Sequence, residues 1–259
     1  MDQKSLQCLL QHLPIPAIRY LEVTTSTNTD ALNWAADGAL DSSLVIADQQ
    51  TAGRGRLGRN WFTHPNSALT FTVIFRPSID ERQKLSFFSP LGALAVCQAI
   101  RQLCKIQAHV KWPNDVLIHS KKVCGVLVET DWQEGTLLGL VMGIGINVTP
   151  LSIPSSPNLQ FPATSLESEC GQTLDREQLL LSVLTNLFHL RRILCSEIFI
   201  KLWESKLAFK GEMITLESTN EKTITGTLKG INKHGELLLW LESGEERTFQ
   251  VGDMKLRPK

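Results

Sequence analysis

Residues 51–60 read "TAGRGRLGRN", so one short segment interleaves three glycines with three arginines. Glycine permits positive φ angles and lets the backbone approach a ligand closely. Arginine adds a permanent charge and planar donors that match phosphate or carboxylate. Because like charges repel, the segment costs stability unless an anion binds there. It is therefore either a solvated basic turn or an anion-binding loop, and its surroundings decide between the two.

The same segment helps to decide the fold, because residues 53–58 fit the pattern G-x-G-x-x-G. In dinucleotide-binding folds this pattern follows a strand and opens a helix whose N-terminus binds the pyrophosphate. The preceding residues 43–50, "SLVIADQQ", are typical of a buried strand. The following residues 59–66, "RNWFTHPN", have no helical periodicity. We therefore reject a dinucleotide-binding turn.

The rest of the chain predicts an α+β protein. A mixed sheet with flanking helices is expected over residues 1–209, and a small SH3-like β-barrel of five short strands over 210–259. Short polar turns predict antiparallel pairing among the last three strands of the first domain. Four prolines in 149–163 predict a mobile loop. The strands expected in the first domain are 43–50, 67–75, 108–118, 122–130 and 136–148, and its helices are 26–36, 84–104, 174–194 and 197–209.

Composition argues against several classes of function. The 259 residues are 42% hydrophobic and 20% charged, and 26 basic residues balance 26 acidic ones. A chain without net charge has no global field to attract nucleic acid or a membrane surface. The N-terminus shows no secretion signal, and the apolar runs are short. Six cysteines without C-x-x-C pairs and six histidines without H-x-x-x-H spacing predict reduced thiols, no bound transition metal and a cytoplasmic location.

A second polar cluster, "KWPND" at 111–115, interrupts the strand pattern. Pro113 fixes its own φ angle and pushes Trp112 out of helical geometry. Asn114 and Asp115 then leave a rigid turn with oxygens able to orient a hydrated magnesium ion. On composition alone, an ordinary strand-end turn capped by Asn and Asp is the more common explanation.

Two further motifs lie beside apolar strands. Lys121 and Lys122 precede "VCGVLVE", and a lysine there either extends to solvent or reaches into a pocket beside Gly125. The segment "GIGIN" at 143–147 ends another strand with two glycines, which permit either a close ligand or a bulge with packing contacts. Each motif alone is ambiguous.

Taken in order, the motifs resemble those of the biotin–protein ligases. The resemblance covers nearly the whole chain, because the helix near 175–195 and the C-terminal barrel also have counterparts in that family. The glycine/arginine loop combined with "KWPND" at this separation is its most specific feature. The matching segments are "STN" (26–28), "QQTAGRGRLGR" (49–59), "KWPNDV" (111–116), "KKVCGVLVE" (121–129) and "GIGINV" (143–148).

The resemblance implies a reaction in two steps. The carboxylate of biotin attacks the α-phosphate of ATP, which gives biotinyl-5′-AMP and diphosphate. A lysine of a biotin carboxyl carrier protein or domain then attacks this mixed anhydride and releases AMP. The first step brings two anions together, so fixed cations must offset their repulsion. The resemblance assigns catalytic roles to Lys122, which contacts both the carboxylate and the α-phosphate, and to Arg56, which retains the adenylate.

The resemblance also implies the residues that bind each substrate. Asn114 is in addition expected near a phosphate-bound Mg²⁺ ion. Helix capping is an alternative role for residues 26–28 that can coexist with ligand binding. Biotin binding is implied for Ser26, Thr27, Asn28, Gln50, Gly53, Arg54, Gly55, Arg56, Lys122 and Gly125. ATP binding is implied for Arg54, Arg56, Lys111, Asn114, Lys122, Asn147 and Arg257.

Two features distinguish this chain from parts of the family. About 20 residues precede the "STN" helix, too few for the DNA-binding domain of members that repress transcription, so no nucleic-acid partner is expected. Phe161 is the nearby candidate for the aromatic that covers adenine in some members. Family members can dimerise through the central sheet, so a homodimer is compatible with the resemblance.

Three alternatives remain open at the level of sequence. A lipoate–protein ligase shares the fold, but lipoate has no ureido group and would leave polar pocket groups unsatisfied at about 1–3 kcal/mol each. A non-catalytic protein-binding module is disfavoured by the presence of Lys122 and Arg56. A nucleic-acid regulator is disfavoured by the neutral charge. We also expect the glycine/arginine loop and the proline-rich loop to become ordered when ligand binds.

Overall fold

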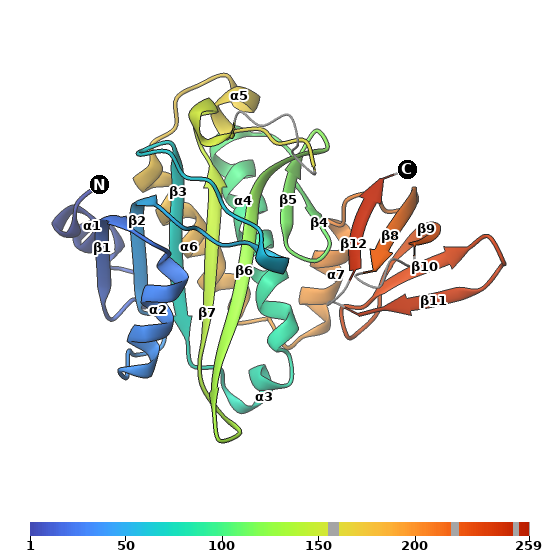
Figure 1. Ribbon diagram of the computed structural model, residues 1–259, viewed down its shortest axis with the longest axis horizontal. Coiled ribbons are helices and arrows are strands. Elements are labelled where there is room, and N and C mark those ends of the chain that lie inside the picture. Colours follow the sequence, from blue (N-terminus) through green and yellow to red (C-terminus); the bar gives the residue numbers. More distant parts are fainter. Residues whose placement is uncertain (155–160, 219–222, 251–253, 259) are drawn as a thin grey trace.

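The structure, a computed structural model, describes all residues except 155–160, 219–222, 251–253 and 259. Its centre is a seven-stranded sheet with the order β1-β2-β3-β7-β6-β5-β4 (Figure 1). β1 runs parallel to β2 and the other neighbours are antiparallel, so the expected mixed sheet is confirmed. Its strands are β1 (Ile18–Thr24), β2 (Leu44–Gln50), β3 (Ala68–Phe75), β4 (His109–Lys111), β5 (Asp115–Ile118), β6 (Lys121–Gln133) and β7 (Thr136–Asn147).

Helices cover both faces of this sheet. α2 and the loop that follows β2 lie over one face, whereas α4 and α6 lie on the other (Figure 1). The α-helices are α1 (Gln3–Leu10), α2 (Thr27–Ala36), α3 (Ile79–Arg82), α4 (Phe88–Cys104), α5 (Leu166–Cys170), α6 (Arg176–Arg191) and α7 (Glu197–Ser205). Short 3-10 turns lie at Arg56–Gly58, Leu85–Phe87 and Pro150–Ser152.

Successive side chains of a strand point to opposite faces of the sheet. Both faces are covered, so both sets of side chains on the central strands are buried. On β2, Leu44 and Ile46 belong to the larger core with α4 and α6. Val45, between them, packs instead with Ala31 and Ala35 of α2. The small alanines let α2 lie close to the sheet. The start of the helix, which carries the "STN" residues, is therefore held against the strands.

The sequence pattern predicts neither α1 nor β1. β1 is an edge strand and much of it is half-buried or exposed, so its apolar pattern is weak. The side chain of Gln3 in α1 donates to Ile18 O at 2.7 Å and accepts from Tyr20 N at 2.9 Å. These two bonds satisfy backbone groups on β1, as an edge strand requires.

The helices predicted at 84–104, 174–194 and 197–209 are all shorter in the structure, and for two of them a late start or an early end has a visible local reason. The helix predicted at 84–104 begins at Phe88, which places Pro90 in its first turn, where the missing N–H is not needed. α7, predicted at 197–209, ends early because the residues after it pair with Val110 of β4.

One segment, Leu85–Cys104, is long and apolar enough to cross a membrane by length and composition. Of its most apolar stretch of 18 residues, 67% is buried in the structure. α4, which makes up most of the segment, packs against both β6 and α6. Its place in the core therefore accounts for its hydropathy.

A second, antiparallel sheet of five strands has the order β11-β10-β9-β8-β12 (Figure 1). Each of the five segments expected to be strands in this part of the chain forms one. The strands are β8 (Met213–Ser218), β9 (Thr223–Ile231), β10 (Leu237–Leu241), β11 (Glu246–Phe249) and β12 (Met254–Pro258). The domain boundary expected at residue 210 stays a prediction.

One tryptophan joins the two sheets. The indole of Trp112, in the "KWPND" turn, is 1% exposed, and its Nε1 donates to the carbonyl of Gly235 at 3.1 Å. Gly235 has a φ of +75°, and a Cβ there would lie 2.6 Å from Trp203 and 3.1 Å from Phe87. Only glycine fits this turn without a shift of its neighbours. The C-terminal sheet is thus docked directly on the "KWPND" turn.

Replacement of Gly235 by alanine should weaken this contact. The added Cβ would collide with Trp203 and Phe87, and overpacking of this kind costs about 1–3 kcal/mol. Gly244→Ala is the matched control, because Gly244 also has a positive φ (+81°) but has no atom within 4 Å of a Cβ. Thermal unfolding should give the lower Tm for Gly235→Ala. Equal Tm values for the two variants would contradict the role of this contact.

Candidate active site

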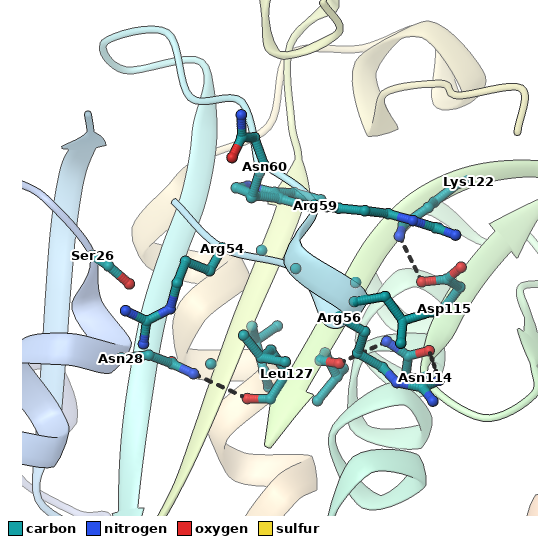
Figure 2. A pocket seen from close by; sticks show the side chains of 18 of the residues that line it. Ser26, Asn28, Arg54, Arg56, Arg59, Asn60, Asn114, Asp115, Lys122 and Leu127 are labelled. Atoms are coloured by element: carbon teal, nitrogen blue, oxygen red, sulfur yellow. Dashed lines mark hydrogen bonds and ion pairs between the residues drawn. The ribbon is translucent and has the colours of Figure 1, made fainter. Parts of the chain in front are cut away.

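The site lies on the face of the sheet that carries α2, between segments that are distant in the sequence. The start of α2 forms one end, β6 and β7 form the floor, the glycine/arginine loop covers it, and the "KWPND" turn forms the other end (Figure 2). Most of the predicted site residues meet here. Those that line the pocket are Ser26, Thr27, Asn28, Gln50, Arg54, Gly55, Arg56, Lys111, Asn114, Lys122 and Gly125.

The glycine/arginine loop folds as a short hairpin over the pocket. Arg54 and Asn60 form an antiparallel bridge, and Trp61 N donates to Gly53 O at 2.7 Å. Residues 56–58 make one 3-10 turn, with Leu57 in the left-handed region at φ 58°. Within the loop, all of which the structure describes, no α-helix follows the glycines. The rejection of a dinucleotide-binding turn is therefore confirmed.

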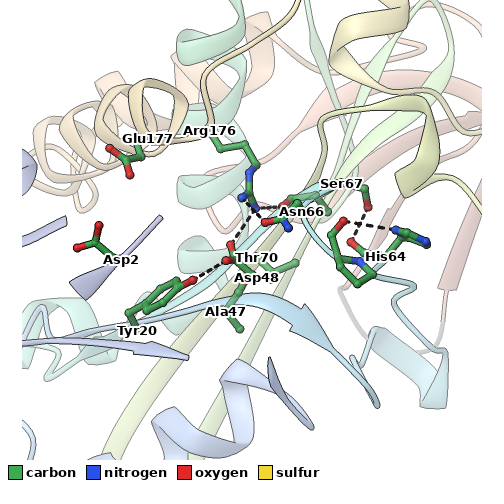
Figure 3. A network of polar contacts seen from close by, with 12 residues as sticks. Asp2, Tyr20, Ala47, Asp48, His64, Asn66, Ser67, Thr70, Arg176 and Glu177 are labelled. Carbon is green, nitrogen blue, oxygen red and sulfur yellow. Dashed lines mark hydrogen bonds and ion pairs between the residues drawn. The ribbon is translucent and has the colours of Figure 1, made fainter. Parts of the chain in front are cut away.

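A half-buried polar network anchors the far end of this loop (Figure 3). Arg176, at the start of α6, donates to Asn66 Oδ1 at 2.8 Å and to Asp48 Oδ1 at 3.0 Å. Asp48 also accepts a hydrogen bond from the Tyr20 hydroxyl. Burial, together with the Asp48 carboxylate, raises the pKa of Tyr20 to about 12, so the phenol remains the donor. The loop therefore ends at a fixed point on the sheet and α6.

Two paired glycines form a flat floor in the pocket. Gly125 of β6 lies opposite Gly145 of β7, and the indole of Trp61 packs on both. A Cβ would lie 2.4 Å from the indole at Gly145 and 3.2 Å from it at Gly125. Trp61 Nε1 is buried, and no described residue accepts a hydrogen bond from it. The pocket thus has an aromatic wall packed on a glycine floor.

The start of α2 supplies the polar end of the pocket. Gln50 Oε1 accepts hydrogen bonds from Thr27 N at 2.8 Å and Thr27 Oγ1 at 3.0 Å. The Gln50 amide is thereby oriented, with its oxygen toward α2. Ser26 occupies the N-cap position, but its side chain makes no capping hydrogen bond. Helix capping is therefore the wrong interpretation of the Ser26 hydroxyl, which is buried beside the pocket.

A buried carboxylate organises the opposite end (Figure 2). Asp115 Oδ1 lies 2.6 Å from Lys122 Nζ, and Asp115 Oδ2 lies 3.5 Å from Lys111 Nζ. Burial alone would raise the pKa of Asp115, but the two ammonium groups outweigh it and hold the pKa below its ordinary value. Arg56 donates to Asn114 Oδ1 at 3.3 Å, and burial lowers its pKa while Asp115 opposes this effect. Three cations thus surround one carboxylate, and the excess positive charge suits a polyphosphate.

The segment after the proline-rich loop packs against this cluster. Lys122 N donates to Pro162 O at 2.7 Å, and Thr164 N donates to Lys122 O at 2.9 Å. The ring centroid of Phe161 lies 4.7 Å from Lys111 Nζ. Phe161, the aromatic expected near the adenine, therefore covers a lysine of the cluster. Residues 155–160 of the predicted mobile loop lie outside the described residues.

The side chains do not form a ready-made magnesium site. Among the residues that the structure describes, no three His, Cys, Asp or Glu side chains gather closely enough to hold a metal ion. The amide oxygen of Asn114 accepts a hydrogen bond from Arg56, and both oxygens of Asp115 face lysines. A divalent cation would have to take most of its ligands from a substrate.

Comparison with known proteins agrees with this geometry. Residues 20–147 match the biotin/lipoate A/B protein ligase family, and residues 210–257 match the biotin protein ligase C-terminal domain. The biotin–[acetyl-CoA-carboxylase] ligase of Paracoccus denitrificans is 32% identical over 233 residues, covering 86% of this chain and 94% of that protein. This chain belongs to the biotin protein ligase family. The resemblance seen in the motifs is thereby confirmed.

Two further relatives are similar to this chain over most of its length. The bifunctional ligase/repressor BirA of Bacillus subtilis (strain 168) is 35% identical over 235 residues, covering 90% of this chain and 72% of that protein. The biotin protein ligase from Aquifex aeolicus, solved in complex with biotin and ATP, superposes with a TM-score of 0.80 at 30% identity. The match covers 95% of this chain and 100% of the Aquifex chain.

Two predicted residues of the ligase, Gly53 and Asn147, are not among the residues that line the pocket. Gly53 acts through its carbonyl, which holds Trp61 in the hairpin. Asn147, at the end of β7, donates to Thr164 O at 3.0 Å and so orders the segment beside Lys122. Arg257 lies on β12, and its side chain lies outside the described residues. The individual roles assigned to the site residues stay predictions.

Three parts of the ligase's site were not predicted from the sequence: the position of Trp61, the partners of Asp115 and the role of Glu129. Trp61 directly follows the arginine loop, and the glycines at 125 and 145 could have indicated a ring packed on the floor. For Asp115 the sequence offered a turn cap or a group that orients hydrated magnesium, and neither role includes its two lysine partners. Glu129 had no local signal, because its partner Arg54 lies 75 residues away in the sequence.

Replacement of Asp115 by asparagine should disorganise the cation cluster. Removal of one partner from a buried pair costs about 3–5 kcal/mol. The folded pKa of Asp115 is lowered, so the ionised carboxylate stabilises the protein above its unfolded pKa of about 3.9, and this contribution is lost as the pH falls through the lower folded pKa. Urea unfolding should show a gap between the wild type and Asp115→Asn at pH 7 that narrows below about pH 4. A gap independent of pH would contradict this account.

Replacement of Gly145 by alanine should displace Trp61. The added Cβ would lie 2.4 Å from the indole, and β7 cannot retreat because it is paired on both sides. We expect biotin affinity to fall at least about tenfold, or 1.4 kcal/mol, while the fold stays intact. Calorimetric titration with biotin measures the affinity, and the circular dichroism spectrum reports the fold. An unchanged affinity would mean that Trp61 does not form the pocket wall.

Proposed function

We propose that the ligase activates biotin with ATP and transfers it to a lysine of a biotin carboxyl carrier protein or domain. The observation that supports this proposal is a single pocket with three parts. It has a polar end, a floor of glycines and an aromatic ring, and a cluster of three cations around Asp115. Biotin has a neutral ureido ring, an apolar chain and a carboxylate in the same order. Binding of apolar and polar parts of a ligand by separate walls is typical of small-molecule pockets.

In the first step the pocket brings two anions together. A carboxylate oxygen of biotin forms a bond to the α-phosphorus, and the bond from that phosphorus to the diphosphate oxygen breaks. Lys122 lies beside the open floor at Gly125, where a Cβ would be 3.2 Å from its Nζ. It can therefore reach both reacting groups, and Arg56 adds a second positive charge. Asp115 holds Lys122 in place, so little reorganisation is needed during the reaction.

In the second step the acyl group moves to the acceptor. The neutral ε-amine of the carrier lysine attacks the carbonyl carbon of biotinyl-5′-AMP, the bond to the phosphate oxygen breaks, and AMP leaves. The amine gives up its proton, and an amide forms. The glycine/arginine hairpin covers the pocket during the first step, so the acceptor needs an opening at its edge.

In this proposal Mg²⁺ enters the site bound to ATP and is not held by the protein alone. The donor set around Asn114 does not fit a direct metal site, since cationic side chains face its oxygens and those of Asp115. Mg²⁺ would neutralise phosphate charge when ATP binds.

The remaining partners follow from the same proposal. The acceptor is a carrier protein or domain, and the reaction runs in the cytoplasm. A homodimer is compatible with the proposal. Nucleic acid is not part of it, because the net charge of the chain is zero.

A lipoate–protein ligase is the nearest competing activity. Ser26 and the Gln50 amide, which Thr27 orients, form a polar end for which lipoate has no matching group. Each unpaired buried group costs about 1–3 kcal/mol. The polar end therefore favours biotin. The buried cation cluster likewise favours catalysis over a binding module, because it suits an anionic reactant.

Exchange of radiolabelled diphosphate into ATP tests the proposal. With Mg²⁺ and biotin the protein should catalyse exchange, and with lipoate or no acid it should not. Lys122→Ala should lower the rate about 10²–10³-fold, the usual effect of removing one charged donor at a reacting centre. Lys121→Ala is the matched control, because Lys121 is exposed and pairs with Glu169 instead of Asp115. Exchange with lipoate alone, or with no acid, would overturn the biotin assignment.

A further inference from the structure

Glu129 of β6 receives hydrogen bonds from two different parts of the site. Arg54 of the glycine/arginine loop places Nη2 at 3.0 Å and 3.1 Å from the two carboxylate oxygens. Asn28 of α2 donates from Nδ2 to Glu129 Oε2 at 2.7 Å. One carboxylate therefore joins the loop, α2 and β6.

These contacts fix the amide of Asn28. Its oxygen accepts a hydrogen bond from Thr72 Oγ1 at 2.7 Å, and its nitrogen donates to Leu127 O at 3.2 Å as well as to Glu129. Figure 2 shows Asn28 directed at the Leu127 carbonyl. A Cβ at Gly143 would lie 2.1 Å from the amide oxygen, so only glycine leaves room for it. Both N–H groups of Asn28 are used within the protein, which makes the residue a support for the neighbouring Ser26 and Thr27.

The Arg54 side chain has a related role in the loop. Its Nη1 donates to Thr29 Oγ1 at 2.7 Å, so the guanidinium bridges α2 and β6. The Arg54 backbone is paired with Asn60 in the hairpin. The first limb of the hairpin is thus tied down at Glu129. The other end is tied independently by Arg176 through Asn66 (Figure 3).

We propose that Glu129 is a positioning residue for biotin, which closes the glycine/arginine hairpin over the biotin end of the pocket and orients the start of α2. It contacts no reacting atom. The inference rests on the proposed function for its effect on catalysis, but the anchoring of the loop can be measured without any reaction.

The proposal predicts a selective effect on biotin. The cation cluster at Lys122 and Asp115 shares no hydrogen bond with Glu129 among the described residues, so the ATP end should be preserved. Loss of Glu129 should raise the KM for biotin about tenfold, and the KM for ATP and kcat should stay within about threefold. A single anchoring interaction worth a factor of 10 corresponds to 1.4 kcal/mol.

The first experiment compares Glu129→Ala, Glu129→Gln and Glu204→Gln in biotin-dependent exchange. Glutamine can still accept from Asn28 but cannot pair with the Arg54 charge, so its KM for biotin should lie between those of the wild type and Glu129→Ala. Glu204→Gln is the matched control, because the Lys210–Glu204 pair has a similar length of 2.8 Å and similar exposure, 45% and 33% against 41% and 30%. It should leave both KM values unchanged.

A double-mutant cycle then tests whether Glu129 acts through the loop. Arg54→Ala combined with Glu129→Ala should raise the KM for biotin by less than the product of the two single effects, because the loss of the Arg54–Glu129 contact is common to both changes. Purely multiplicative effects would show that Glu129 does not act through Arg54 and would overturn the proposal.

Limited trypsin digestion gives a readout that needs no activity. The loop contains the cleavage sites Arg54, Arg56 and Arg59, and mass spectrometry identifies cuts at each. Glu129→Ala should be cut in the loop several-fold faster than the wild type and Glu204→Gln. Equal loop cleavage and an unchanged KM for biotin would overturn the proposal. Absence of exchange in the wild type would refute the proposed function alone, because the cleavage rates would still decide whether Glu129 anchors the loop.

Discussion

The pocket depends on one buried anion. Lys111 and Lys122 both pair with the Asp115 carboxylate, and the same carboxylate attracts the partly buried Arg56 guanidinium. Without it the three cations would have to separate or become exposed. With it the cluster keeps an excess of positive charge, which is what the meeting of a carboxylate with a polyphosphate requires. Asp115 comes from the same turn as Trp112, so the C-terminal sheet that binds Trp112 also supports the cluster.

Strand β6, next to the middle of the sheet, sets the spacing of the site. It carries Lys122 beside the cation cluster, Gly125 in the floor and Glu129 at the biotin end. A strand rises about 3.3 Å per residue, so the seven steps from Lys122 to Glu129 span roughly 23 Å. The distance between the cation cluster and the end of the pocket at α2 is therefore fixed by backbone geometry. The glycine/arginine loop adds Arg56 and the cover of the pocket, and both of its ends are tied to helices and strands.

Much of this arrangement could be predicted from the sequence, and the failures have a common cause. The strands at 43–50, 67–75 and 136–148 and the helix at 26–36 have strong local patterns, and their predicted bounds are close to the observed ones. The single strand predicted at 108–118 is wrong, because the "KWPND" turn divides it into β4 and β5. The glycines and the proline of the "KWPND" turn indicate tight turns and close backbone contacts by residue type alone. The sequence did not reveal β1, which is an edge strand with a weak pattern, or the partners of Trp61 and Glu129. Those roles depend on contacts between segments that meet only in the folded chain.

The indole of Trp61 has a further consequence, which is optical. It is one of six tryptophans in the chain, and it lies in the pocket on a bare glycine floor, whereas Trp112 and Trp203 are sealed in the core. A ligand that enters the pocket must change the surroundings of this fluorophore before any bond is made. The protein therefore carries an intrinsic reporter of occupancy, and rapid-mixing fluorescence can separate the arrival of each substrate from the chemistry that follows.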